Sequence, residues 1–166
     1  MNTDDRFTPR INYSKLASEG IRGLTELEAY VKSSGLEHNL IELVKLRASQ
    51  INGCAYCIDM HTKDARTAGE SEQRLYALNA WEEAPFYTER ERAALEWTET
   101  VTLISETHAP DEVYQHVRVH FSEKELVDLT LAIVAINSWN RMAISFRSLP
   151  GSYKPDHFVA QNEVQK

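Results

Sequence analysis

The chain has 166 residues, of which 42% are hydrophobic and 26% are charged, a composition typical of globular proteins. A chain of this length buries roughly 70% of its unfolded surface, so it needs neither disulfides nor a structural metal to fold. Its net charge of −7 argues against binding to nucleic acid or to an anionic membrane surface, and no charge-free apolar run reaches the roughly 18 residues of a membrane span.

The apolar residues recur at helical spacing, and we find no alternating pair of strands joined by a hairpin turn. We therefore expect an all-α protein with a single domain over residues 1–166. The expected helices cover residues 13–33, 38–50, 54–68, 71–79 and 88–106, a short helix that begins near Pro110, and residues 122–146. A polar lead-in (residues 1–10) precedes them and an extended C-terminal arm (residues 147–166) follows.

Turn and capping signals set these boundaries. Asn52-Gly53 is a turn pair, and Gly69 is a typical helix stop. Thr88 with Glu91, and Ser122 with Glu125, have the spacing of capping boxes. The helix over residues 122–146 is apolar on more than one face, so we expect it to be buried on all sides, in part by a second subunit.

The only two cysteines form the motif Cys54-Ala55-Tyr56-Cys57. The N-terminus lacks the apolar segment of a signal peptide, so we expect a cytoplasmic protein whose thiols are reduced. In that compartment a Cys-x-x-Cys pair is typical of redox chemistry or metal binding. Gly53 allows a turn that brings Cys54 to the start of a helix, where the backbone N–H groups favour a thiolate.

His61 follows Cys57 by four residues, so the two side chains share one face of a helix. His61 is therefore placed to accept the proton of Cys57 or to stabilise its thiolate. Glu42 lies on the preceding helix, which the turn at Asn52-Gly53 can fold back toward the cysteines. Its carboxylate would orient His61 or relay a proton through water. Two alternatives remain open: a zinc site that combines both cysteines and His61 with a further ligand, and two buried, inert cysteines.

These residues together resemble the core of the carboxymuconolactone decarboxylase family, in its alkylhydroperoxidase D-like branch. The resemblance rests on Glu42-Leu43, Asn52-Gly53-Cys54-Ala55-Tyr56-Cys57, His61, Ala65 and Gly69. It implies an alkylhydroperoxidase D-like helical bundle that assembles into homotrimers or homohexamers. It also implies a thiol peroxidase without a cofactor, in which Cys57 becomes a sulfenic acid, Cys54 resolves it to a disulfide, and Glu42 and His61 form a proton relay.

The chain departs from the family pattern at one position, and two functions other than peroxidase remain open. The best-studied branch has a histidine between the cysteines, where this chain has Tyr56, so any relay through that histidine is lost or altered here. One rival is the lactone decarboxylation that names the family, against which the Cys-x-x-Cys pair argues. The other is a thiol–disulfide partner or redox sensor that does not turn over peroxide. The expected partners of a peroxidase are a hydroperoxide and a dithiol reductant or redox protein.

Several other residues receive structural interpretations. We expect Trp81, Trp97 and Trp139 to be core residues and Arg47 to form an ordinary ion pair. His116 and His120 are four residues apart and give only a weak indication of a metal site. Asn140 lies within an apolar helix and needs hydrogen-bond partners if it is buried.

Overall fold

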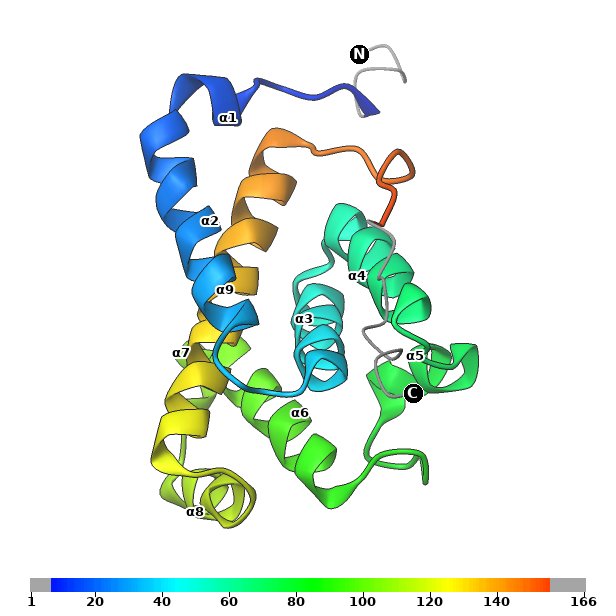
Figure 1. The fold of residues 1–166 in the computed structure, drawn as a ribbon, viewed down its shortest axis with the longest axis vertical. Helices are drawn as coiled ribbons and strands as arrows, with labels where there is room; N and C mark the ends of the chain where they lie inside the picture. The colour runs from blue at the N-terminus through cyan, green and yellow to red at the C-terminus, as the bar shows by residue number, and fades with distance from the viewer. Residues whose placement is uncertain (1–6, 156–166) are drawn as a thin grey trace, which may run out of the picture.

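The computed structural model describes residues 7–155, and within this range every regular element is a helix (Figure 1). In chain order these are α1 (Tyr13–Leu16), α2 (Ser18–Lys32), α3 (His38–Asn52), α4 (Ala55–Thr67), α5 (Glu72–Ala77), the 3-10 turn η2 (Leu78–Ala80), α6 (Glu89–Thr102), α7 (Ile104–Thr107), α8 (Asp111–His120) and α9 (Glu123–Phe146). The expectation of an all-α fold is confirmed. None of the described helices is long and apolar enough to cross a membrane.

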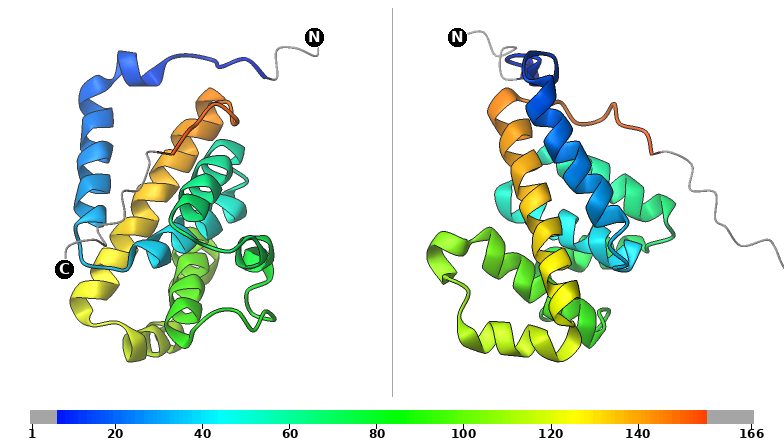
Figure 2. Two further views of the ribbon diagram at one scale, coloured as in Figure 1. Left: turned by 45° about the vertical axis from the view of Figure 1, so that its right-hand side comes forward. Right: turned by 60° about the vertical axis from the view of Figure 1, so that its left-hand side comes forward.

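Helix α3 lies at the centre and packs against α4, α6 and α9, while α2 lies along α9 (Figures 1 and 2). Nine of its fifteen residues are buried, and they include the two charged residues Glu42 and Lys45. One set of apolar side chains from α3 packs with α6 and α9, and a second packs with α4 and α5. A third, smaller cluster contains both cysteines and joins α3 and α4 to α9.

The predicted boundaries around the site are confirmed. Gly53 has a left-handed backbone with φ of 69°, so the chain can leave α3 and start α4 within two residues. Both capping boxes form, with each hydroxyl and each glutamate satisfying the other residue's backbone N–H. Helix α9 therefore begins directly after Ser122 and runs without interruption to Phe146, as expected.

Three helix predictions need correction. The helix expected over residues 13–33 divides at Ala17, and Gly20 and Gly23 both lie inside α2. The helix expected over residues 88–106 ends at Thr102, and a separate turn, α7, follows Leu103. The segment 71–79 is a one-and-a-half-turn α-helix that continues as a 3-10 turn. The backbone angles of Ala17 and Leu103 are not helical, whereas residues 77 and 78 keep right-handed helical angles. None of these residues is glycine or proline, so no local signal predicts the changes.

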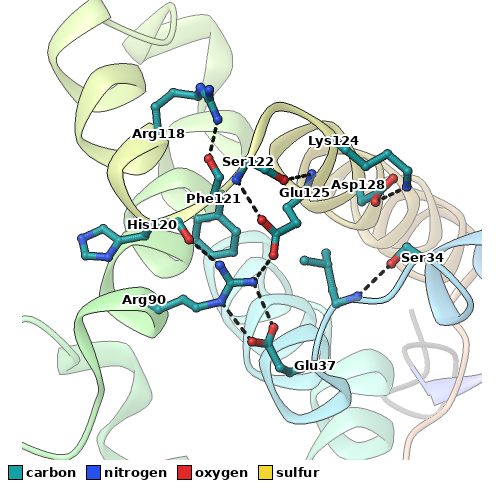
Figure 3. Close-up of polar contacts among 11 residues, drawn as sticks. Ser34, Glu37, Arg90, Arg118, His120, Phe121, Ser122, Lys124, Glu125 and Asp128 are labelled. Carbon is teal, nitrogen blue, oxygen red and sulfur yellow. Dashed lines mark hydrogen bonds and ion pairs between the residues drawn. The ribbon is translucent and has the colours of Figure 1, made fainter.

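Arg90, at the start of α6, forms polar contacts that connect three helices (Figure 3). Its guanidinium donates to the carboxylates of Glu37 and Glu125 and to the carbonyl oxygen of His120. It also lies over the ring of Phe121, 4.0 Å from the ring centroid. This cluster connects the start of α3, the start of α6 and the start of α9 at one end of the bundle.

Helix α9 is not buried on all sides within one chain, and its expected burial by a second subunit stays a prediction. Val127, Val134 and Ile144 are exposed, whereas Ile136 is fully buried. After α9 the chain turns back over α4: the backbone N–H of Gly151 donates to Asp59, and Lys63 donates to the carbonyl oxygen of Tyr153. The predicted C-terminal arm is thus described as far as residue 155, and residues 1–6 and 156–166 lie outside the described range.

Candidate active site

Helices α3 and α4 bring the four residues predicted from the sequence, Glu42, Cys54, Cys57 and His61, to one region. Glu42 is on α3, Cys54 directly precedes α4, and Cys57 and His61 are one turn apart on α4. The left-handed Gly53 folds α4 back against α3, so Glu42 meets His61 although 19 residues separate them. The predicted approach of Glu42 to the cysteine-bearing helix is confirmed.

The two thiols are adjacent, free and almost completely buried. The Sγ atoms of Cys54 and Cys57 lie 2.8 Å apart, and each residue is 1% exposed. Sulfurs this close, in one chain and on one helical turn, can be oxidised to a disulfide with little movement of the backbone. Of the interpretations left open by the sequence, the pairing geometry fits a redox pair better than two inert cysteines.

The two thiols shift each other's pKa in opposite directions. The hydrogen bond with the thiol of Cys57 lowers the pKa of Cys54 to about 7, against the effect of burial and with help from backbone N–H groups of Tyr56 and Cys57. The same hydrogen bond, together with burial, raises the pKa of Cys57. The helix-start argument for Cys54 is thus supported. The hydrogen bond with Cys54 is the largest influence on the pKa of Cys57, and the role of His61 toward Cys57 stays a prediction.

Asn140 of α9 is a site residue that sequence reasoning placed elsewhere. It is fully buried, its amide donates to the hydroxyl of Ser49 at 3.1 Å, and its carbonyl oxygen accepts from Asn52 at 2.8 Å. Hydrogen bonding by Asn140 also helps to lower the pKa of Cys54 and offsets part of the rise in the pKa of Cys57. Its hydrogen-bond partners therefore lie within the chain, as a buried polar residue requires. The signal for this residue in the sequence is its position as a polar residue within an apolar helix.

Glu42 and His61 form a buried pair, with Glu42 Oε2 2.9 Å from His61 Nδ1. Burial raises the pKa of Glu42, but the hydrogen bond and the charge of His61, with the charge of Lys45, outweigh it and leave this pKa below its ordinary value. Glu42 is therefore ionised at neutral pH and fixes the orientation of the imidazole. The other ring nitrogen, Nε2, is then available for proton transfer.

A cavity of about 580 Å³ adjoins this pair. Its apolar and aromatic wall contains Tyr13, Ile41, Tyr56, Met60, Trp139 and Ala143, and its polar wall contains Glu28, His38, Glu42, Lys45, His61 and Asp64. Cys57 lines the cavity, whereas Cys54 does not. The volume lies in the range of small-molecule sites, so Cys57 is the sulfur positioned to meet a substrate.

The arm that follows α9 contributes to the same cavity. Tyr153 and Pro155 line it, and the hydroxyl of Tyr153 donates to Asp64 Oδ1 at 2.8 Å. Burial holds the pKa of Asp64 above its ordinary value despite this hydrogen bond. Tyr153 and Asp64 were not predicted as site residues, because only the return of the arm over α4 brings them together.

The sequence predicts that all three tryptophans belong to the core, and two of them are buried. Trp81 and Trp97 are buried, and their indole N–H groups donate to Glu99 and Thr130. Trp139 is only half-buried and lines the cavity, so its assignment to the core was incomplete.

The contacts of Arg47, His116 and His120 can also be compared with what the sequence indicated. Arg47 forms the expected ion pair, with Glu99, at 2.8 Å. His116 pairs with Glu96 and stacks edge-on against His120, which accounts for both rings without a metal.

Comparison with known proteins assigns this arrangement to a family. The model of the carboxymuconolactone decarboxylase family matches residues 19–100, which include all four predicted site residues. The chain is 51% identical over 136 residues to YdfG, an uncharacterized protein of Bacillus subtilis (strain 168), covering 82% of this chain and 92% of YdfG. This chain belongs to the carboxymuconolactone decarboxylase family.

Solved structures agree with the fold. The crystal structure of ATU0492 from Agrobacterium tumefaciens, a protein of unknown function suggested to be the antioxidant defence protein AhpD, is 52% identical, with a TM-score of 0.85. The match covers 88% of this chain and all of that one. An uncharacterized peroxidase-related protein from Silicibacter sp. TM1040 shares the fold at 23% identity, with a TM-score of 0.73, over 81% of this chain and 72% of its own. The chain is thus an alkylhydroperoxidase D-like member of its family.

Proposed function

We propose that this protein is a thiol-dependent hydroperoxidase in which Cys57 is the peroxide-attacking thiol and Cys54 resolves it. The observation that carries the proposal is the combination of two free sulfurs 2.8 Å apart with a cavity that Cys57 and His61 line together. A cytoplasmic setting suits this cycle, because cellular reductants there return disulfides to thiols. We further propose the homotrimer or homohexamer that the family resemblance implies.

The first half of the cycle consumes the peroxide. The Cys57 thiol gives its proton to His61 Nε2, while Glu42, bonded to Nδ1, stabilises the imidazolium. The Cys57 sulfur attacks the terminal oxygen of the hydroperoxide, the O–O bond breaks, and the alkoxide leaves with the proton from His61 as an alcohol. Cys57 is oxidised by two electrons to a sulfenic acid.

The second half forms the disulfide. The Cys54 sulfur, which has the lower pKa, attacks the Cys57 sulfur, and the S–O bond breaks with release of water. An external dithiol, or a redox protein that carries one, then reduces the disulfide and restores both thiols. The apolar and aromatic wall of the cavity favours organic hydroperoxides over hydrogen peroxide as substrates.

A coupled assay of peroxide consumption with a dithiol reductant tests the proposal. The wild-type chain is expected to consume organic hydroperoxide catalytically, Cys57→Ser to consume none, and Cys54→Ser to accumulate a sulfenic acid that a dimedone-type probe labels on Cys57. Sulfenic acid in Cys57→Ser would instead reverse the roles of the two cysteines.

The second candidate function is a redox sensor or thiol–disulfide partner, which Tyr56 at the position of the relay histidine and the raised pKa of Cys57 favour. The same assay separates the two. A sensor forms one disulfide per chain with peroxide but shows no turnover when the dithiol is in excess. Release of carbon dioxide from a carboxylated lactone would instead identify the decarboxylase activity.

A further inference from the structure

A cluster of potential metal ligands overlaps the Glu42–His61 pair. One ligand atom from each of Glu42, His61 and Asp64 lies within 4.8 Å of the other two. His61 and Asp64 are three residues apart on α4, so they share one face of that helix, and Glu42 approaches from α3. All three line the cavity. This is the way in which helical bundles build metal sites, from inward-facing residues on adjacent helices.

Besides His61, the basic residues whose charges act on this cluster are Lys45 and His38. Glu42 is buried and Asp64 is half-buried, so two carboxylates and one imidazole meet away from bulk water. Lys45 lies on the same wall, but its ammonium group is bonded to the carboxylate of Glu28. Buried carboxylates are normally paired with a cation or coordinate a metal.

The contacts already present leave coordinating capacity. The hydroxyl of Tyr153 donates to Asp64 Oδ1, and a carboxylate has a second oxygen. His61 has two ring nitrogens, of which Nδ1 faces Glu42. The adjoining cavity has room for the water molecules that complete a coordination shell.

We propose that Glu42, His61 and Asp64 form a binding site for a divalent first-row transition cation beside the thiol pair. One imidazole and two carboxylates are a donor set that suits zinc or manganese, with water in the remaining positions. The site differs from a cysteine zinc site, because neither sulfur belongs to it. Binding of a cation by Glu42, His61 and Asp64 does not depend on the peroxidase activity.

The position of this site has a consequence that rests on the proposed function. A bound cation occupies a lone pair of His61 and an oxygen of Glu42, the atoms assigned to the proton relay. The cation and the relay are therefore mutually exclusive, and the metal acts as a reversible inhibitor of Cys57 oxidation.

Metal binding is measured on a chain that has no thiols. In Cys54→Ser/Cys57→Ser, isothermal titration with Zn²⁺ is expected to show one site per chain. Adding Asp64→Asn to this chain weakens binding by at least about tenfold, in line with the loss of a ligand group. Adding Asp111→Asn, at the exposed start of α8 and outside the lining of the cavity, is the control and leaves binding unchanged. Circular dichroism confirms that each variant is folded.

A second readout identifies the ligand directly. In the thiol-free chain, Zn²⁺ is expected to shift the ring NMR signals of His61, which are assigned by their loss in His61→Gln. No binding by the thiol-free chain, equal affinities in the Asp64 and Asp111 variants, or unmoved His61 signals would each overturn the proposal. These measurements use no peroxide, so their failure is distinct from failure of the peroxidase. With the wild-type chain, Zn²⁺ inhibition that Asp64→Asn relieves would support the inhibitory role.

Discussion

At the residue scale, the chemistry of the thiol pair depends on which sulfur holds the shared proton. The hydrogen bond between the sulfurs lowers the pKa of Cys54 to about 7 and raises that of Cys57, so the pair loses its first proton near neutral pH and its second at much higher pH. Cys57 nevertheless faces the cavity. A proton must therefore leave Cys57 before it attacks a substrate, and this is the task that we assign to His61 and Glu42.

The first prediction concerns this titration. The ultraviolet absorbance of thiolate in the reduced protein should rise by one thiolate per chain as the pH increases through about 7. Cys57→Ala should move that rise upward, toward the ordinary thiol value of 9.0, because it removes the hydrogen bond that lowers the pKa of Cys54. Cys54→Ala should lower the pKa of Cys57. An unchanged midpoint in Cys57→Ala would show that the pair is not coupled.

The second prediction concerns Asn140. Asn140→Ala should raise the pKa of the first thiol, because the amide hydrogen bond to sulfur is lost. It should also reduce the free energy of unfolding by about 1–3 kcal/mol, since Ser49 and Asn52 lose a buried partner. Thiol titration and urea unfolding measure the two effects. Asn137→Ala is the matched control: it removes another bond to Asn52 and should leave the thiol titration unchanged.

The site residues differ in how well the sequence predicts them. Glu42, Cys54, Cys57 and His61 lie within one short stretch, and helical spacing together with one turn signal is sufficient to bring them together. Asn140 is 88 residues from its partner Asn52, and Asp64 meets Tyr153 across 89 residues. Such contacts depend on how α9 packs against α3 and how the arm packs against α4, which local patterns do not encode.

At the element scale, Glu125 takes part both in the capping box at the start of α9 and in the contacts of Arg90 (Figure 3). The backbone N–H and the hydroxyl of Ser122, with the guanidinium of Arg90, lower the pKa of Glu125 to about 2. The glutamate thus satisfies the helix start and joins α9 to α6 and to the start of α3. Its side chain remains 38% exposed, so solvent screens the ion pair.

The third prediction follows from this contact. Glu125→Gln should lower the free energy of unfolding at neutral pH. Because the folded pKa of about 2 lies below the ordinary 4.5, this stabilisation is complete above pH 4.5 and is lost as the pH falls through about 2. The difference between wild type and variant in urea unfolding should therefore shrink over that window. Glu123→Gln, at an exposed neighbouring position, is the control and should show a smaller difference throughout.

The capping boxes also show what local sequence can and cannot define. The starts of α6 and α9 were predicted to the residue, because a hydroxyl and a glutamate three residues apart satisfy backbone groups within the same segment. The breaks at Ala17 and Leu103 have no such signal. The one at Ala17 accompanies a tertiary contact, in which the ring of Tyr13 on α1 packs against Phe146 at the end of α9.

At the scale of the whole molecule, α9 connects the site to the outer surface. Its buried side includes Ile136, which packs in the small cluster with both cysteines. Its other side presents Val127 and Val134, which are 57% and 44% exposed and are seven residues apart, so they lie on one face. Exposed apolar residues on one face of a helix whose opposite side is packed are the kind of surface that a homo-oligomer covers.

The fourth prediction is that this face of α9 belongs to the subunit interface. Light scattering at micromolar concentration should give three or six times the chain mass of 19.0 kDa. Val134→Glu should lower the native mass while circular dichroism stays unchanged, because the side chain is exposed within one chain and a charge at an interface core is unfavourable. Ile136→Glu would not serve, since it places a charge in the core beside the cysteines. Ser138→Glu, one turn further along α9, tests how far the interface extends. A wild-type mass equal to one chain would contradict the assembly, and an unchanged mass in Val134→Glu would move the interface to another face.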